Sequence, residues 1–292
     1  MSRLFQQMQE SGATSAVSAA VPSTVPELLG LLHRETQTTR DATLAPLLSC
    51  QRVELRPLNL PILTASDSDA ATHSAFESYR SLRTKITRLQ ASQGIRSIAI
   101  TSAVAGEGKT ISALNLAISF AQLGTQRILL VDGDIRTEGL SKLAGISGRP
   151  GLGEVLNGGC EFANAVLSTS IPELYAVGAG EPTSVASDLF AASRWKEFIA
   201  WCNETFNMVI VDCPPILGLA DFDLISAACD GTVVIVRAHK TKREMLTTVA
   251  KHLEGKKVLG IVLNGEEHRH ANYYGYYYYA QHKGQTTNTS KK

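Results

Sequence analysis

The sequence lacks the marks of a metal-stabilised or secreted protein. It has no CxxC pair, and none of its five cysteines has a histidine or another cysteine at zinc-ligand spacing. The N-terminus is too short in its apolar run for a signal peptide, and no stretch approaches the roughly 18 apolar residues of a transmembrane helix. We therefore expect a cytoplasmic chain without membrane spans, whose reduced and mostly buried cysteines are Cys50, Cys160, Cys202, Cys213 and Cys229.

An excess of charge of either sign is also missing. The 292 residues carry a formal net charge of +1, with 44% hydrophobic and 19% charged residues. These are ordinary values for globular domains, and the length suits one or two domains with a full core. Because the chain has no general attraction for an anionic polymer, we expect no nucleic-acid partner.

The composition divides the chain into three regions. Residues 1–70 are predicted to be a flexible N-terminal arm, because Gly12–Pro26 has the composition of a linker. The alternative is a docking arm that folds on a partner. Residues 71–270 are predicted to form the folded domain. Residues 271–292 are predicted to be a disordered, tyrosine-rich tail, because its last part contains only small and polar residues.

Strand-like and helix-like segments alternate from Arg96 onward. Apolar, β-branched runs predict strands, and the longer stretches with apolar residues at helical spacing predict helices. Strands that are apolar throughout and separated by helices indicate an α/β fold, with a parallel, twisted sheet of about six or seven strands covered by helices on both faces. The predicted strands are Ser97–Thr101, Ile128–Val131, Glu173–Val177, Met208–Val211, Thr232–Val236 and Val258–Leu263, and the predicted helices are Thr72–Gln90, Lys109–Leu123, Ser184–Asn203, Ala220–Ala228 and Lys240–Glu254.

The first of these strands leads into a phosphate-binding loop. Ala103–Thr110 has P-loop spacing, with Ala103 in place of the first glycine. Gly106 and Gly108 allow backbone N–H groups to approach phosphate oxygens, and the following helix presents its N-terminus to the anion. Lys109 supplies a charge for the β- and γ-phosphates and Thr110 a hydroxyl for Mg²⁺, so the loop predicts a site for ATP with Mg²⁺. An ordinary glycine turn that caps a helix is the less favoured interpretation.

Two further strands end in aspartates. Ile128–Val131 leads into Asp132 and Asp134, and Met208–Val211 leads into Asp212. The carboxyl ends of parallel strands share one edge of a sheet, where ligands bind. Three carboxylates beside a triphosphate would repel it unless a hard cation lies between them. Mg²⁺, held by few protein groups together with phosphates and water, fits this arrangement.

In this order, the motifs closely resemble the three Walker motifs of bacterial tyrosine kinases, the autokinases that regulate capsule and exopolysaccharide synthesis. The second motif is Ile128–Arg136 and the third is Met208–Pro215. Upstream, Glu77–Arg83 matches the Glu-x-x-Arg-x-x-Arg self-association helix of that family, and downstream Tyr273–Tyr279 matches its autophosphorylated tail. The resemblance covers about 75–279 and implies that residues 71–270 are a P-loop tyrosine kinase domain.

The resemblance implies a role for each site residue. Asp132 would accept the proton of a substrate tyrosine or orient its hydroxyl, and Lys109 and Asp134 would complete the catalytic group. Thr110, Asp134 and Asp212 would hold Mg²⁺, directly or through water. The residues that would bind the nucleotide are Ala105, Gly106, Glu107, Gly108, Lys109, Thr110, Ile111 and Asn264, the last of them on adenine.

The resemblance also implies partners. Family members form rings in which the tail of one subunit enters the site of the next, so Glu77 would pair with Arg80 or Arg83 of a neighbour; on spacing alone, a solvated helix face is the alternative. A separate transmembrane activator would recruit the chain to the inner face of the cell membrane, and a cognate tyrosine phosphatase would reverse the reaction. The phosphoacceptors would be Tyr273, Tyr274, Tyr276, Tyr277, Tyr278 and Tyr279, six of the chain's eight tyrosines.

Two other functions remain open. A ParA/MinD-type ATPase switch shares the fold, but it carries a signature lysine where this chain has Val104, and it has no tyrosine tail. An ATP-bound, non-catalytic scaffold of the export machinery would use the tyrosines as a docking surface, and the intact lysine and aspartates argue against it. A Rossmann dehydrogenase is excluded because Gly108 leads into Lys109 rather than toward a third glycine.

Overall fold

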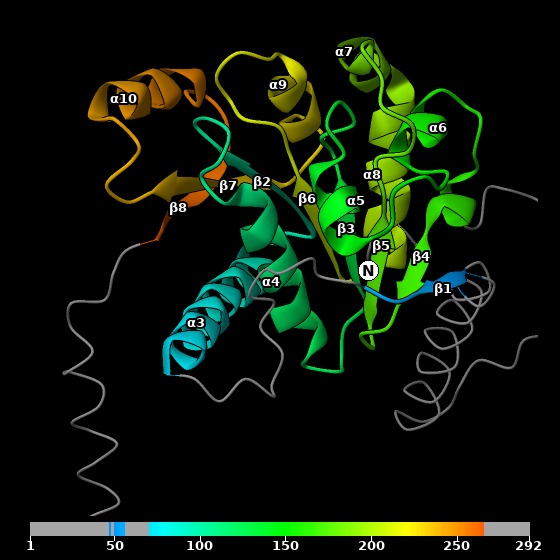
Figure 1. Cartoon of the computed structure of the whole chain (residues 1–292), viewed down its shortest axis with the longest axis horizontal. Helices are drawn as coiled ribbons and strands as arrows, with labels where there is room; N and C mark the ends of the chain where they lie inside the picture. The colour runs from blue at the N-terminus through cyan, green and yellow to red at the C-terminus, as the bar shows by residue number, and fades with distance from the viewer. Residues whose placement is uncertain (1–46, 48–49, 56–69, 266–292) are drawn as a thin grey trace, which may run out of the picture. The chain divides into compact units, whose positions relative to one another are not determined.

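One eight-stranded sheet organises the described part of the chain, in the order β1-β4-β5-β3-β6-β2-β7-β8 (Figure 1). The structure is a computed structural model, and it describes residue 47, residues 50–55 and residues 70–265. All neighbouring strands run parallel except β4 and β5, which are antiparallel. The strands are β1 Gln51–Val53, β2 Ser97–Ser102, β3 Ile128–Asp132, β4 Leu167–Thr169, β5 Leu174–Val177, β6 Met208–Asp212, β7 Gly231–Arg237 and β8 Val258–Asn264.

Helices cover both faces of this sheet, as the sequence predicts. Alternate residues of the central strands point to opposite faces. One set, which includes Ile98 and Ile210, packs with α3, α4 and α5, and the other, which includes Ala99 and Val211, packs with α6 to α10. The helices are α3 Ala70–Gln93, α4 Lys109–Ala121, α5 Gly139–Ala144, α6 Leu152–Leu156, α7 Ala186–Ala191, α8 Ser193–Thr205, α9 Asp221–Ser226 and α10 Arg243–His252, with a 3₁₀ turn at Phe162–Ala165.

The sheet has eight strands, against the about six or seven predicted, because it contains two short strands besides the six runs named in the sequence. All six runs singled out in the sequence are strands, but β1 and β4 contain three residues each and carry little apolar pattern. β1 pairs with β4 at one edge of the sheet. Since β1 lies within residues 1–70, this short part of the predicted flexible arm is instead part of the sheet. Nearly all the rest of the arm and the whole of 271–292 lie outside the described residues.

The predicted helix Ser184–Asn203 is two helices. Ala192 is extended, with φ −69° and ψ 157°, and it separates α7 from α8. The break allows Phe190 and Trp195 to meet in the core with ring centroids 5.2 Å apart. Among the described residues, no helix is long and apolar enough to span a membrane.

Candidate active site

The P-loop lies between β2 and α4, as predicted. Gly106 and Gly108 have φ values of 83° and 94°, the left-handed region that glycine tolerates best. Gly108 also leaves room for the side-chain amide of Asn264, which a Cβ at this position would displace. The carbonyl of Gly108 accepts a hydrogen bond from Ser112 N–H at 2.9 Å, which starts α4.

Glu107 ties the P-loop to its neighbours. The side chain is 3% exposed, and its carboxylate accepts hydrogen bonds from Val104 N–H at 3.1 Å and from the hydroxyl of Thr241. Asn264, at the end of β8, donates from Nδ2 to the main-chain carbonyl of Glu107 at 2.8 Å. The predicted nucleotide residue Asn264 therefore lies against the P-loop, while its contact with adenine stays a prediction.

Lys109 lies between two of the predicted aspartates. Its Nζ is 3.6 Å from Asp134 Oδ2 and 3.7 Å from Asp212 Oδ1. Burial alone would lower the pKa of Lys109, but the charges of Asp212 and Asp134 outweigh it, so the pKa is raised. The lysine therefore stays charged, and three strand-end motifs meet at one point, as the sequence predicts.

The carboxylate of Asp212 has hydrogen-bonding capacity to spare. It is fully buried, and neither of its oxygens receives a hydrogen bond of ordinary length from the described residues. Burial raises the pKa of its carboxyl group to about 6, against the opposing effects of Lys109 and the Thr110 hydroxyl. Beyond its ion pair with Lys109, this buried carboxylate can therefore accept a further ligand, and carboxylate with hydroxyl oxygens suits Mg²⁺.

The residues present thus fit Mg²⁺, provided that other ligands complete its shell. No group of three or more His, Cys, Asp or Glu side chains suited to a metal occurs in the described ranges. An ion held by Thr110, Asp134 and Asp212 would therefore take its remaining ligands from phosphate oxygens and water, which is usual for Mg²⁺.

The carboxylate of Asp132, which is predicted to contact the substrate hydroxyl, has both its oxygens engaged in hydrogen bonds within the chain. Its Oδ2 accepts two hydrogen bonds from Ser141, one from N–H and one from the hydroxyl, both at 2.7 Å, and its Oδ1 accepts one from Asp134 N–H at 3.2 Å. Asp132 is 0% exposed, and burial together with Asp212 raises its pKa to about 7 despite the Ser141 hydrogen bonds. In this conformation the carboxylate organises the loop after β3 and does not face solvent.

Gly133 allows the ends of β3 and β6 to come together. Its N–H donates to the Asp212 carbonyl at 2.8 Å, and a Cβ on Gly133 would lie 2.9 Å from the same oxygen. The glycine between Asp132 and Asp134 is therefore required for close packing of the two aspartate motifs.

Arg136 pairs with a residue that the sequence analysis did not single out. Its Nε donates to Asp221 Oδ2 at 2.6 Å and its second guanidinium nitrogen to Oδ1 at 3.1 Å. Arg136 also bonds the carbonyl of Ser184 and the hydroxyl of Ser187. Burial would raise the pKa of Asp221, but the hydrogen bonds that its carboxylate accepts from Arg136 and from the Ser187 hydroxyl, with the charge of Arg136, lower it. Arg136 thus fastens the loop after β3 to α7 and α9.

The predicted self-association residues lie on α3, which packs beside α4, where the Tyr79 hydroxyl donates to Ser112 Oγ at 3.4 Å. Glu77 and Arg80 pair within the chain at 3.1 Å, and both side chains are 50% exposed. Arg83 is half-buried and donates to the carbonyl of Ser119, near the C-terminus of α4. Arg83 therefore has a role within one chain, whereas Glu77 and Arg80 remain available to a neighbour.

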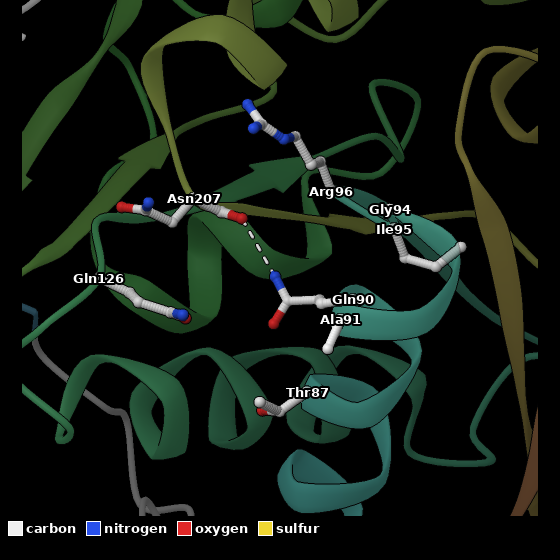
Figure 2. Close-up of a pocket in the computed structure, with 8 residues that line it drawn as sticks. All are labelled: Thr87, Gln90, Ala91, Gly94, Ile95, Arg96, Gln126 and Asn207. Atoms are coloured by element: carbon white, nitrogen blue, oxygen red, sulfur yellow. Dashed lines mark hydrogen bonds between the residues drawn. The ribbon is translucent and has the colours of Figure 1, made fainter. Parts of the chain in front are cut away.

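An open pocket of about 380 Å³ lies at the opposite end of the strands (Figure 2). Gln90 crosses it and donates to the carbonyl of Asn207 at 3.1 Å. Its lining comes from the C-terminal part of α3 and from the residues that precede β2, β3 and β6, and it contains none of the predicted site residues. The pocket is separate from the candidate active site.

Sequence reasoning missed the residues that support the site. Ser141, Thr241 and Asp221 each bond a motif residue that is distant in the sequence. Each is an ordinary polar residue at or near a helix start, which carries no signal of a partner. The predicted phosphoacceptor tyrosines lie outside the described residues.

The fold and this site define a class, the P-loop nucleotide-binding proteins. Residues 95–255 match the family model described as an AAA domain. The chain is 32% identical over 203 residues to tyrosine-protein kinase YwqD of Bacillus subtilis, covering 69% of this chain and 85% of that protein. It is 33% identical to tyrosine-protein kinase ptk of Acinetobacter johnsonii, but covers only 29% of that longer protein. The chain belongs to the bacterial tyrosine kinase family.

Solved structures agree with this assignment. The kinase domain of Escherichia coli tyrosine kinase ETK superposes with a TM-score of 0.67 and 25% identity, over 73% of this chain and 83% of that domain. The septum site-determining protein MinD of Pyrococcus horikoshii superposes less well, with a TM-score of 0.51 and 24% identity over 60% of this chain and 72% of its own. The second likeness shows the fold alone. The predictions of the fold and of the kinase family are confirmed.

Proposed function

We propose that the chain is an ATP- and Mg²⁺-dependent protein-tyrosine autokinase that phosphorylates the tyrosine cluster at 273–279. The observation that carries this proposal is the meeting of Lys109 with Asp134 and Asp212 at the P-loop, where both Asp212 oxygens lack hydrogen bonds from the described residues. A charged lysine, a hydroxyl and carboxylates at a helix N-terminus suit a nucleoside triphosphate with its cation.

Each of these residues would have its own role in phosphoryl transfer. A tyrosine hydroxyl oxygen attacks the γ-phosphorus, the bond to the β-phosphate oxygen breaks, and ADP leaves. Lys109 and the P-loop N–H groups stabilise the charge on the transferring phosphoryl group. Mg²⁺, when bound by Thr110, Asp134 and Asp212, neutralises phosphate charge. The hydroxyl proton passes to a carboxylate, because a tyrosine pKa near 10 leaves the hydroxyl protonated at neutral pH.

Asp132 is our candidate for receiving that proton or for orienting the hydroxyl. Since its oxygens accept hydrogen bonds from Asp134, in the loop after β3, and from Ser141, in α5, direct contact with a substrate requires this loop and the start of α5 to move. Hydrogen bonds at catalytic carboxylates commonly rearrange when substrates bind.

The remaining predictions belong to the same proposal. Residues 71–270 are the kinase domain, residues 1–70 the arm and 271–292 the substrate tail. The chain acts in the cytoplasm as a ring-like homo-oligomer, with Glu77, Arg80 and Arg83 at the interface. A transmembrane activator recruits it to the inner face of the membrane, a tyrosine phosphatase reverses the modification, and the outcome is control of capsule or exopolysaccharide synthesis and export.

Intact mass after incubation with ATP and Mg²⁺ tests this function. The full chain is compared with Lys109→Met and with a variant in which the six tail tyrosines are changed to phenylalanine. Added phosphate in the parent, absent from both variants, is the expected result. ATP hydrolysis without added phosphate would instead favour an ATPase switch, and neither reaction, with or without a membrane activator, would favour a scaffold.

A further inference from the structure

The segment around α10 concentrates positive charge on a chain that is nearly neutral. Residues 237–257 contain seven lysines and arginines and two glutamates, a formal charge of +5, while the whole chain has +1. Five of these side chains are exposed and have no carboxylate within 4 Å in the described part of the chain. We call them the basic surface, and they are Lys240, Lys242, Arg243, Lys251 and Lys257.

The basic surface begins beside the nucleotide site. Thr241, between Lys240 and Lys242, donates its hydroxyl hydrogen to Glu107 of the P-loop. From there the surface continues along α10, where Arg243 and Lys251 are eight residues apart and so share one helix face. The other basic residues of the segment are less free, since Lys256 pairs with Asp223 at 3.2 Å and Arg237 is half-buried.

The tail leaves the sheet at the same place. The carbonyl of Asn264, the last residue of β8, accepts a hydrogen bond from Ala238 N–H at 2.8 Å, two residues before Lys240. Residues 266–292 follow directly, and Tyr273 is eight residues beyond Gly265. Eight residues span up to about 26–29 Å, whereas the ten residues of α10 are about 15 Å long. The tether to Tyr273 is therefore longer than α10, so the tail tyrosines can reach Lys240, Lys242, Arg243 and Lys251 of their own chain, and the later tyrosines have a longer tether still.

Charge decides which form of the tail this surface accepts. Unmodified residues 266–292 contain four lysines and arginines and two glutamates, a formal charge of +2, so they are repelled. Each tyrosine phosphate adds about −1.5 to −2 charges and three acceptor oxygens, and six would add roughly −9 to −12. Phosphate oxygens bind lysine and arginine through short, charge-assisted hydrogen bonds.

We propose that the basic surface is the docking site of the phosphorylated tail of the same chain. This rests on the proposed function, which produces the phosphotyrosines. Docking would hold a phosphorylated tail beside the P-loop of its own chain, so that it no longer enters the active sites of neighbouring subunits. The surface would distinguish a finished tail from an unmodified one by the sign of its charge.

Binding of a synthetic peptide tests the proposal without relying on kinase activity. The peptide is residues 266–292 with phosphotyrosine at all six cluster positions, and its unphosphorylated counterpart is the reference. The protein is the full chain with its own six tail tyrosines changed to phenylalanine. Fluorescence anisotropy is expected to show at least about tenfold tighter binding of the phosphopeptide, weakening as salt is added.

A matched pair of triple variants locates the site. Lys240→Gln, Lys242→Gln and Arg243→Gln together are expected to weaken phosphopeptide binding at least about tenfold. The control, Lys85→Gln, Arg88→Gln and Lys196→Gln, removes three exposed charges elsewhere and should leave binding within about twofold. Thermal unfolding of both checks that the folds are intact. Equal binding by the first variant and the parent would overturn the proposal.

Two further experiments test whether the basic surface binds the tail of its own chain, the tail of another chain, or a membrane. A chain whose tail has been phosphorylated, by itself or by an unrelated tyrosine kinase, should bind the peptide more weakly at every protein concentration, since its own tail competes. Binding that is unchanged would overturn docking within one chain. Cosedimentation with phosphatidylserine vesicles that depends on the same three residues, without phosphopeptide binding, would make the surface a membrane-binding one and would also overturn the proposal.

Discussion

Asp212 has a buried charge that the polypeptide alone does not satisfy. Its pKa is raised from 3.8 to about 6, so the folded chain holds the proton more tightly than the unfolded chain does. Stability linked to this group is therefore fully present below about pH 4 and is lost as the pH rises through about 6. Asp132, with a pKa near 7, acts in the same direction.

Replacing Asp212 with asparagine should therefore stabilise the metal-free and nucleotide-free chain. We expect Asp212→Asn to raise the free energy of unfolding by about 1–3 kcal/mol at pH 8, with the difference vanishing near pH 4. Urea denaturation in a chelator measures this, and the same variant should lose autophosphorylation. An unchanged or lower stability at pH 8 would mean that Lys109 and Thr110 already compensate the charge of Asp212.

At the level of elements, Arg136 connects the loop after β3 to α7 and α9. The side chain of Asp221 is 2% exposed and that of Arg136 is 26% exposed, so the pair is largely screened from water. Removing the arginine leaves the buried carboxylate of Asp221 without a positive charge beside it, with the Ser187 hydroxyl as its remaining donor, and this costs more than the pair itself contributes.

Arg136→Ala is expected to lower the free energy of unfolding by about 2–4 kcal/mol. The control is the double variant Arg136→Ala with Asp221→Asn, which removes the uncompensated charge and should recover part of the loss. Denaturant titration of the three chains is the measurement. If the double variant were no more stable than Arg136→Ala, the loss would come from the contacts of Arg136 with Ser184 and Ser187.

The elements that sequence predicts well are the long, strongly patterned ones. All six apolar strand runs are present. Burial on both faces gives the inner strands a continuous apolar pattern, whereas the edge strand β8 is apolar but has only exposed and half-buried residues. The predicted helices are also present, with Ser184–Asn203 divided at Ala192. β1 and β4 have three residues each and form only through pairing with distant strands, so no local pattern marks them. The P-loop and aspartates follow from spacing, whereas Ser141 and Thr241 act across 9 and 134 residues and have no local signature.

At the scale of the whole molecule, α3 contains residues that support the fold of one chain and residues that are predicted to join neighbouring chains. The Glu77–Arg80 pair is half-exposed, so it contributes only about 0–1 kcal/mol to the stability of one chain. Arg83 instead bonds the end of α4 and supports the fold.

Glu77→Ala and Arg80→Ala should therefore reduce the mass of the oligomer measured by light scattering and leave the thermal midpoint of unfolding nearly unchanged. Arg83→Ala should lower the thermal midpoint as well, because the carbonyl of Ser119 loses its donor. An oligomer that persists in the first two variants would show that this face of α3 is a solvated surface, and the self-association prediction would be wrong.

The central claim, transfer of phosphate from ATP to the tail tyrosines of a neighbouring copy, is tested most directly by mixing two complementary variants. One is full-length Lys109→Met, with an intact tail and no working site. The other has an intact site and all six tail tyrosines changed to phenylalanine. Neither alone should gain phosphate with ATP and Mg²⁺. In the mixture, mass spectrometry should find phosphate on the Lys109→Met chain at positions 273–279. If the parent protein phosphorylates itself in the same assay but the mixture gains no phosphate at these positions, transfer between chains would be contradicted.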